Sequence, residues 1–314
     1  MKQLKNVSAS VHQRLLTLSR QSGRPFNEWA QYYALERWLY RLSQSDYQKQ
    51  FVLKGALMLL AWKMPFSRPT RDIDLLGHVS NDLTFVRNAI ASICRIPSDA
   101  DGMVFDHESV TTERIAEDAD YEGVRAKFRA FLGNANLPMQ IDIGFSDVIT
   151  PEATTIVYPS ILGHPAPVLR AYNRETVIAE KFETMVKLGE LNSRMKDFFD
   201  ICGLARTGRF HGMELSRAIE RTFSHRGTPL ITGPTCFTEA FATSPSKVAQ
   251  WSAFLRRNNF TEAPNTFREA VNFIAEFLRP IVIASLEKQD WDFNWENGGP
   301  WRRAGNFAKP KDSE

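Results

Sequence analysis

Residues 51–77, FVLKGALMLLAWKMPFSRPTRDIDLLG, combine an apolar run, a Lys-Gly-Ala step, a basic loop with prolines and two aspartates separated by one residue. The segment Asp72-Ile73-Asp74-Leu75 alternates like a half-buried strand, so both carboxylates project from one face. Carboxylates about 7 Å apart on a strand repel each other unless a cation lies near them. A hard divalent ion such as Mg²⁺, which takes oxygen ligands, removes this repulsion.

The first half of the same stretch predicts a short buried helix over residues 56–63, preceded by Lys54 and Gly55. A turn of small residues at a helix start lets backbone N–H groups approach a phosphate closely. Together, phosphate donors and a carboxylate pair predict a site for a nucleoside triphosphate with Mg²⁺. An Asp-x-Asp pair is also common on solvated faces and in turns, so its meaning depends on the rest of the chain.

Length and composition predict a globular protein with one large domain or two ordinary ones, because the 314 residues are 43% apolar. A net charge of +3 permits a polyanionic partner without demanding one. The three cysteines are isolated in sequence, which argues against a disulfide framework or a zinc site and favours a reducing compartment. No signal peptide and no bilayer-length apolar stretch is recognisable, so the expected location is the cytoplasm, without a membrane partner.

The rest of the first half predicts helices and strands in turn. Helical spacing of apolar residues indicates helices over 8–21, 27–43 and 82–94, and the aromatic face of the second is typical of core packing. Alternation predicts a strand over 124–130 with one basic face and another over 137–145, which places Asp142 on a polar face. If this second strand neighbours Asp72 and Asp74, three carboxylates converge on one metal site. Alternatively, Asp142 is an exposed strand residue.

From residue 173 the pattern becomes helical, so we place a domain boundary near residue 172. The predicted organisation is an α/β domain over 1–172, a helical domain over 173–296 and a polar tail over 297–314. Helices are expected over 174–189, 213–223, 246–256 and 265–286, with a further helix opening at Asn192-Ser193.

Two charged residues of this helical half fall on apolar helix faces. At about 100° per residue, Lys181 lies in the middle of the face that includes Val177 and Phe182. A buried ammonium needs an anionic partner, which could be a triphosphate; the alternative is a side chain that snorkels along the edge of the core. Asp197 falls inside the apolar arc of its helix, whereas Asp200 lies outside it. Asp197 is thus the candidate carboxylate, or else an exposed acid that complements the helix dipole.

Several motifs, in this order along the chain, together resemble the AbiEii/AbiGii-type nucleotidyltransferase toxins of the DNA polymerase β-like superfamily. They are Phe51-Val-Leu-Lys-Gly-Ala56, Arg68-Pro-Thr-Arg-Asp-Ile-Asp-Leu-Leu76, Gln140-Ile-Asp-Ile-Gly144, Ala179-Glu-Lys-Phe182 and Asn192-Ser-Arg-Met-Lys-Asp197.

The resemblance implies an α+β fold, with a mixed-sheet nucleotidyltransferase domain and flanking helices followed by an all-helical domain, and an active site between the two. It implies that Asp72 and Asp74 bind Mg²⁺, that Gly55 and Ala56 contact phosphates, and that Lys181 and Asp197 complete the site. Ala56 departs from the Gly-Ser step widespread in the superfamily, so a hydroxyl contact is missing. The full set of expected residues is Asp72, Asp74, Asp142, Lys181 and Asp197 for catalysis, with the first three as metal ligands, and Lys54, Gly55, Ala56, Thr70, Arg71 and Lys196 for the nucleotide.

The function implied by the resemblance is a toxin of a toxin–antitoxin or abortive-infection system. It would transfer NMP from an NTP to an RNA hydroxyl, with the tRNA 3′ end as the expected acceptor, one or two Mg²⁺ ions as cofactor and a cognate antitoxin as a further partner. Asp142 or Asp197 would serve as base, while Lys181 and Arg71 would offset charge on the pyrophosphate. The alternatives are nucleotidylation of a protein or small-molecule hydroxyl, and an NTP-binding module without turnover.

Overall fold

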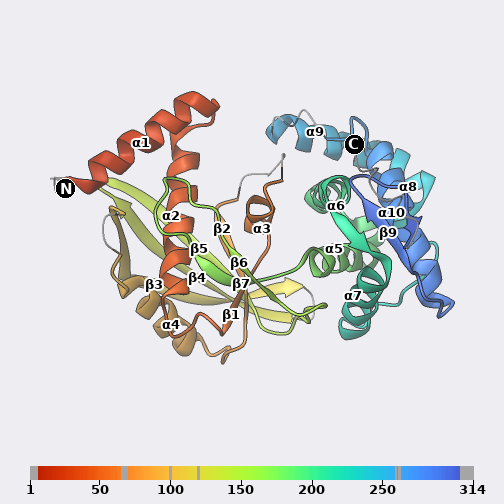
Figure 1. The fold of residues 1–314 in the computed structure, drawn as a ribbon, viewed down its shortest axis with the longest axis horizontal. Helices are drawn as coiled ribbons and strands as arrows, with labels where there is room; N and C mark the ends of the chain where they lie inside the picture. Colours follow the sequence, from red (N-terminus) through yellow and green to blue (C-terminus); the bar gives the residue numbers. More distant parts are fainter. Residues whose placement is uncertain are drawn as a thin grey trace, which may run out of the picture. The chain divides into compact units, whose positions relative to one another are not determined.

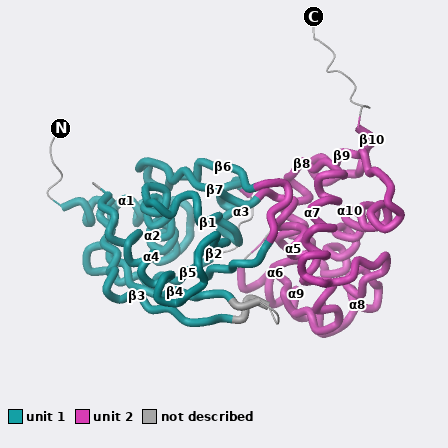
Figure 2. Tube along the Cα trace, turned by 90° about the horizontal axis from the view of Figure 1, so that it is seen from below, with its two compact units in different colours: residues 1–63, 67–147, 153–172 teal, residues 64–66, 148–152, 173–314 magenta. Residues whose placement is uncertain are grey.

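The computed structural model describes residues 6–64, 70–98, 101–118, 121–258, 260 and 263–304. These residues form two compact units, coloured separately in Figure 2. Unit 1 comprises residues 1–63, 67–147 and 153–172, and unit 2 comprises residues 64–66, 148–152 and 173–314. Most of the basic loop expected between the two halves of the opening stretch, residues 65–69, lies outside the described residues.

Unit 1 is built on a seven-stranded mixed sheet with the strand order β3-β4-β5-β2-β1-β7-β6. The pairs β2/β5 and β1/β7 are parallel, and the other four neighbouring pairs are antiparallel. Both strands predicted by alternation are present, as β4 and β5. The bounds are β1 (Phe51–Lys54), β2 (Asp72–Gly77), β3 (Met103–Asp118), β4 (Tyr121–Leu132), β5 (Ala135–Gly144), β6 (Thr154–Val157) and β7 (Val168–Ala171).

One face of this sheet is covered by helices and forms the core of unit 1. The helix α2 packs against β5 and β7, and α4 packs against β3 and β4, as Figure 1 shows. Ile73 of β2 and Ile141 of β5 are fully buried on this face because their strands alternate apolar and polar residues. The bounds are α1 (Val7–Ser22), α2 (Phe26–Ser43), α3 (Leu57–Ala61) and α4 (Leu83–Arg95).

The helix α3 is shorter than the predicted 56–63. Its last residue is Ala61, and the backbone of Lys63 is left-handed, with a φ of 53°. A left-handed residue cannot continue a right-handed helix, so the chain turns away at this point.

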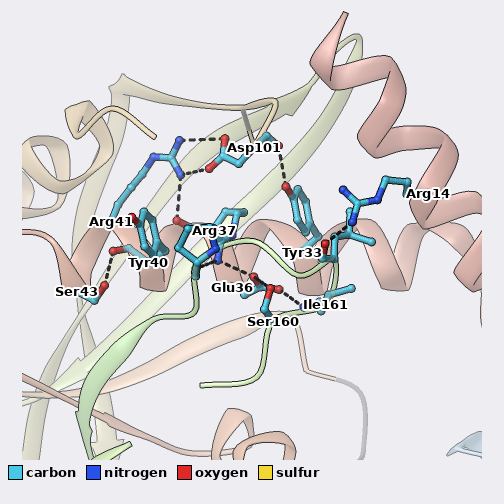
Figure 3. A network of polar contacts seen from close by, with 12 residues as sticks. Arg14, Tyr33, Glu36, Arg37, Tyr40, Arg41, Ser43, Asp101, Ser160 and Ile161 are labelled. Atoms are coloured by element: carbon cyan, nitrogen blue, oxygen red, sulfur yellow. Dashed lines mark hydrogen bonds and ion pairs between the residues drawn. The ribbon is translucent and has the colours of Figure 1, made fainter. Parts of the chain in front are cut away.

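The helix α2 is buried nearly all round, and its charged residues pair inside unit 1 (Figure 3). The guanidinium of Arg41 donates to both carboxylate oxygens of Asp101, at 2.7 and 3.4 Å. Arg37 donates to Glu36 at 2.6 Å, and the backbone N–H of Ile161 donates to Glu36 at 2.7 Å. Each buried charge requires a partner. The partners of Arg41 and Glu36 join α2 to the loops that contain Asp101 and Ile161.

We expect Asp101→Asn to lower the free energy of unfolding by about 3–5 kcal/mol, because it leaves the charge of Arg41 buried without its counter-ion. The side chains of this pair are only 4% and 1% exposed. Urea unfolding measures the loss. The control is Glu28→Gln, which removes the half-exposed pair with Arg24 and should cost less than about 1 kcal/mol. Equal losses in the two variants would contradict the prediction.

Unit 2 is mostly helical. The predicted helices are present, with two short 3₁₀ turns between them. The bounds are α5 (Arg174–Leu188), η1 (Gly189–Leu191), α6 (Met195–Thr207), α7 (Gly212–His225), η2 (Thr235–Phe237), α8 (Glu239–Thr243), α9 (Pro245–Asn258) and α10 (Phe267–Leu286).

A small three-stranded antiparallel sheet adds to these helices, which the all-helical expectation did not include. Its order is β10-β9-β8, with bounds β8 (Arg209–His211), β9 (Phe293–Glu296) and β10 (Arg302–Arg303). The indole N–H of Trp301 donates to the carbonyl of Phe277 at 2.9 Å, and its ring stacks on the Phe277 ring. The packed part of unit 2 therefore extends past residue 296 into the expected tail, of which residues 305–314 lie outside the described residues.

The architecture is thus α+β, with a mixed sheet and flanking helices followed by a mainly helical part, as predicted. Among the helices of the described residues, none is both long and apolar enough to cross a membrane.

Candidate functional site

The two aspartates of the opening stretch lie on the polar face of β2. Asp72 and Asp74 are half-buried, while Ile73 and Leu75 between and beyond them are fully buried on the other face. In the register of the sheet, Asp74 lies opposite Lys54 on β1 and opposite Asp142 on β5. Paired residues of neighbouring strands project from the same face, so the sheet carries a row of charged side chains here.

Asp72 is held by the residues that precede it. The hydroxyl of Thr70 donates to its Oδ1 at 2.8 Å, and the backbone N–H of Arg71 donates to the same oxygen at 3.2 Å. Thr70 is buried, whereas the side chain of Arg71 is exposed. Two of the residues expected to bind nucleotide thus fix the orientation of one carboxylate oxygen.

Asp74 lies against the turn that joins β1 to α3. A Cβ added to Gly55 would stand 1.8 Å from Oδ2 of Asp74 and 2.5 Å from its Cγ, and the φ of Gly55 is +73°. Only glycine allows both this backbone conformation and this close approach. Ala56 follows with its side chain buried, so the turn contributes backbone groups and no hydroxyl. Gly55 therefore makes room for the carboxylate of Asp74.

Asp142 lies opposite Asp74 on the neighbouring strand, as the expected cluster requires, and its carboxylate is paired with an arginine. Its two oxygens accept hydrogen bonds from Nε and Nη2 of Arg125 on β4, at 2.8 and 2.7 Å, and Gln140 donates to Oδ2 at 3.3 Å. These hydrogen bonds raise the pKa of Arg125, which therefore remains a cation. Arg125 lies opposite Asp142 in the register of β4 and β5, so the sheet itself sets the pair. Asp142 is therefore held in a bidentate ion pair.

Lys54 has a carboxylate partner that the sequence analysis did not single out. Its Nζ lies 2.8 Å from Oδ2 of Asp147, which follows β5, and the two side chains are 9% and 8% exposed. The hydroxyl of Tyr172 also lies 3.5 Å from this oxygen. The expected nucleotide-binding lysine thus takes part in a buried ion pair.

The described carboxylates of unit 1 are too few to hold a resident Mg²⁺ ion with protein ligands alone. They fit better an ion that is bound together with a nucleotide. Within the described residues, no group of three or more histidine, cysteine, aspartate or glutamate side chains is placed to hold a metal. Asp72 and Asp74 provide two carboxylates on one face. Mg²⁺ keeps several waters and is usually bound through one or two carboxylates together with substrate phosphates. This donor set therefore suits an ion that is completed by a triphosphate.

In unit 2, Lys181 of α5 contacts two carboxylates of α6. Its Nζ lies 2.7 Å from Oδ1 of Asp197 and 2.8 Å from Oδ2 of Asp200, and both aspartate side chains are 1% exposed. Nε of Arg194 lies 2.6 Å from Oδ2 of Asp197. The position of Lys181 on an apolar helix face requires an anionic partner, and the carboxylates of Asp197 and Asp200 provide it.

The start of α6 differs from the expected start at Asn192-Ser193. The helix begins at Met195, with Arg194 as its N-cap, because the 3₁₀ turn η1 precedes it. The side chain of Asn192 is fully buried and accepts a hydrogen bond from the backbone N–H of Arg194 at 2.8 Å. This contact fixes the approach to the first turn, which contains Asp197 and the exposed Lys196.

The charges around Asp197 determine its protonation state. Burial by itself raises the pKa of this carboxyl, but the charges of Lys181 and Arg194 and their hydrogen bonds outweigh burial. The pKa of Asp197 therefore lies well below its ordinary value. A carboxylate with so low a pKa is a weak proton acceptor, which argues against Asp197 as the general base.

The low pKa of Asp197 predicts a loss of stability in acid. A carboxyl whose pKa is lower in the folded than in the unfolded state stabilises the fold above the unfolded value, about 3.9, and loses this contribution as the pH falls toward the folded value. We expect the free energy of unfolding of the wild type to fall between about pH 4 and pH 2, and Asp197→Asn to reduce this slope. Urea unfolding at several pH values tests this expectation. An unchanged slope in the variant would contradict it.

The model of the family described as nucleotidyl transferase AbiEii toxin, type IV TA system, matches residues 37–273. The chain belongs to the AbiEii family. Family membership implies an antitoxin partner, since these toxins belong to toxin–antitoxin systems. The match spans β1, β2, α5 and α6, and with them all the expected site residues.

Comparison with individual proteins adds two remote structural neighbours of this AbiEii-family chain. No curated protein matches it. The crystal structure of JHP933 from Helicobacter pylori aligns with a TM-score of 0.43 and 15% identity, over 80% of this chain and 89% of that one. A second H. pylori structure, described as a candidate nucleotidyltransferase, aligns with a TM-score of 0.43 and 16% identity, over 80% and 92% of the two chains.

Sequence reasoning did not single out Asp147, Arg125, Arg194 or Asp200 as site residues. Arg125 was visible only as part of a basic strand face, and its pairing with Asp142 required the register of the sheet. Asp200 was set aside because the helical wheel places it outside the apolar arc of its helix. Its spacing of three residues from Asp197 was a usable signal, since residues three apart share a helix face.

Proposed function

We propose that this AbiEii-family protein is a Mg²⁺-dependent nucleotidyltransferase that moves NMP from an NTP to an RNA 3′-hydroxyl. The tRNA 3′ end is the expected acceptor, the cytoplasm the expected location and growth arrest the expected outcome. The strongest support is the carboxylate pair of β2, in which Thr70 orients Asp72 and Gly55 makes room for Asp74. Fixed, adjacent carboxylates without a covalent role are typical of phosphoryl-transfer sites.

In this proposal Asp72 and Asp74 hold one or two Mg²⁺ ions together with the triphosphate. Bound Mg²⁺ supplies neutralisation of the phosphate charge and lowers the pKa of the acceptor hydroxyl. The 3′ oxygen forms a bond to the α-phosphorus, the bond from this phosphorus to the bridging oxygen of the β-phosphate breaks, and pyrophosphate leaves. The hydroxyl proton passes to solvent, because Asp142 is paired with Arg125 and the pKa of Asp197 is low.

Lys181 and Arg71 are proposed to stabilise the negative charge that develops on the leaving pyrophosphate. Asp197 then acts as the counter-ion that keeps Lys181 in place. Gly55 and Ala56 would offer backbone N–H groups to a phosphate, and the exposed Lys196 would offer its ammonium. The energy of such contacts rises where water is excluded.

The test is incubation of purified protein with total RNA, Mg²⁺ and each α-phosphate-labelled NTP in turn. The expected result is label in a tRNA-sized band for one NTP, with wild-type protein and not with Asp72→Ala/Asp74→Ala. A parallel reaction with γ-phosphate-labelled NTP should leave the RNA unlabelled, since the γ-phosphate leaves within pyrophosphate.

Other outcomes would replace the proposed acceptor or the proposed activity. Label on protein or on a small molecule would show that the acceptor is a hydroxyl of that molecule and not of RNA. Binding of NTP without transfer in any pool would favour a binding module and overturn the transferase proposal.

A further inference from the structure

Asp200 lies in the same cluster as the proposed catalytic lysine, and the proposed reaction assigns it no role. Its side chain is nearly inaccessible to solvent, at 1% exposed, and its Oδ2 is 2.8 Å from Nζ of Lys181. Burying a carboxylate is costly unless it is paired. The position of Asp200 therefore reflects a specific requirement for this ion pair.

The two aspartates of the cluster differ in the cations that they contact. Asp197 has two cationic neighbours, with Lys181 on Oδ1 and Arg194 on Oδ2. Asp200 comes one helical turn later and approaches Lys181 from a second position on α6. The cluster therefore brings carboxylates of α6 and the ammonium of Lys181 into direct contact in a buried setting.

A lysine has a long side chain with many rotamers, and a single ion pair restricts it only in part. Two carboxylates that contact the same ammonium at 2.7 and 2.8 Å define its position much more narrowly. A small misplacement of a charged group can cost a large factor in rate, because catalysis depends on the orientation of charge.

We propose that Asp200 is a positioning residue, which together with Asp197 fixes the ammonium of Lys181 for its action on the triphosphate. The inference rests on the proposed function, since it assigns Asp200 a role through Lys181. Asp200 itself does not contact the reacting atoms in this scheme, so its removal leaves the nucleotide site intact but less well aligned.

Asp200→Asn keeps the size of the side chain and removes its charge. We expect kcat for labelled NTP transfer to fall about tenfold and the affinity for the NTP to fall less, by about threefold, because the misaligned ammonium acts mainly in the transition state. The stoichiometry of NTP binding, measured by titration, should stay that of the wild type. A merely structural defect would lower the stoichiometry instead.

The matched control is Glu183→Gln. Glu183 is a fully buried carboxylate on the same helix as Lys181, and it pairs with Arg226 at 3.0 Å rather than with Lys181. We expect this variant to lose thermal stability and to keep kcat per folded molecule. Equal changes in kcat for Asp200→Asn and Glu183→Gln would overturn the proposal.

A double-mutant cycle with Lys181→Met tests whether Asp200 acts through the lysine. NTP affinity is the readout, because it needs no turnover. We expect Asp200→Asn to weaken binding by about threefold or more in the wild-type background and to have little effect once Lys181 is removed. Additive effects would overturn the proposal.

The measurements of NTP affinity also distinguish a failure of the proposed role of Asp200 from a failure of the proposed transferase function. Coupling between the two positions in a protein that binds NTP without transferring it would support the role of Asp200 and refute the transferase function. A wild type that binds no NTP would overturn both.

Discussion

Asp74→Asn is expected to slow nucleotide transfer by on the order of 1,000-fold, because it removes one of the two charges proposed to hold Mg²⁺ with the triphosphate. Asparagine has nearly the same size, so the packing against Gly55 is retained. The initial rate of label transfer to RNA, measured over a range of Mg²⁺ concentrations, gives the effect. Raising the Mg²⁺ concentration should restore only part of the rate, since the remaining carboxylate of Asp72 binds the ion weakly.

The matched control for this variant is Asp82→Asn. Asp82 caps α4, where its side chain accepts a hydrogen bond from the backbone N–H of Phe85 at 2.8 Å. Asparagine caps a helix about as well as aspartate, so the rate should remain that of the wild type. If Asp74→Asn were as active as Asp82→Asn, the metal site would have to lie elsewhere.

Gly55→Ala is expected to lower the transfer rate by about 100-fold or more. The new methyl group would stand 1.8 Å from Oδ2 of Asp74, so the carboxylate must move. β2 lies between β1 and β5, so the strand carrying Asp74 is paired on both sides and cannot shift away easily. Displacement of a metal-binding oxygen changes the geometry of the bound triphosphate, and the rate falls accordingly.

Gly163→Ala isolates the effect of backbone conformation. Gly163 has nearly the same φ, +72°, but nothing lies within 4 Å of the position of an added Cβ. Both variants should lose about 1–2 kcal/mol of stability from the left-handed conformation, and only Gly55→Ala should lose its rate. Equal rates in the two variants, measured well below their unfolding temperatures, would show that the close approach of Gly55 to Asp74 does not affect the transfer rate.

Much of the fold was predictable because its signals are local. The alternation in 137–145 and the helical spacing in 82–94 each reflect one buried face, and the corresponding strand and helix are present in the structure as β5 and α4. The small sheet of β8, β9 and β10 was missed, because its strands are two to four residues long and the pairing of β8 with β9 joins segments more than 80 residues apart. Short strands leave too few residues for an alternating pattern.

The candidate site was predictable in its residue types and not in its pairings. The sequence alone indicated Asp72 and Asp74 on one strand face and placed a lysine, Lys181, on an apolar helix face. It did not show that Asp142 is held by Arg125, since that depends on the register between β4 and β5. It also did not show that Lys54 meets Asp147, which lies 93 residues away in the chain.

The amino-acid sequence by itself determined which face of each strand is polar, where most helices lie and which motifs the chain shares with its family, because periodicity and motif order are properties of neighbouring residues. Tertiary structure alone decided how the carboxylates are paired. Asp142 is paired with Arg125, Asp197 and Asp200 both contact Lys181, and Asp74 lies against Gly55. The physical reason is that the energy of a charge depends on what lies within a few ångströms of it, and strand register and helix packing set those neighbours.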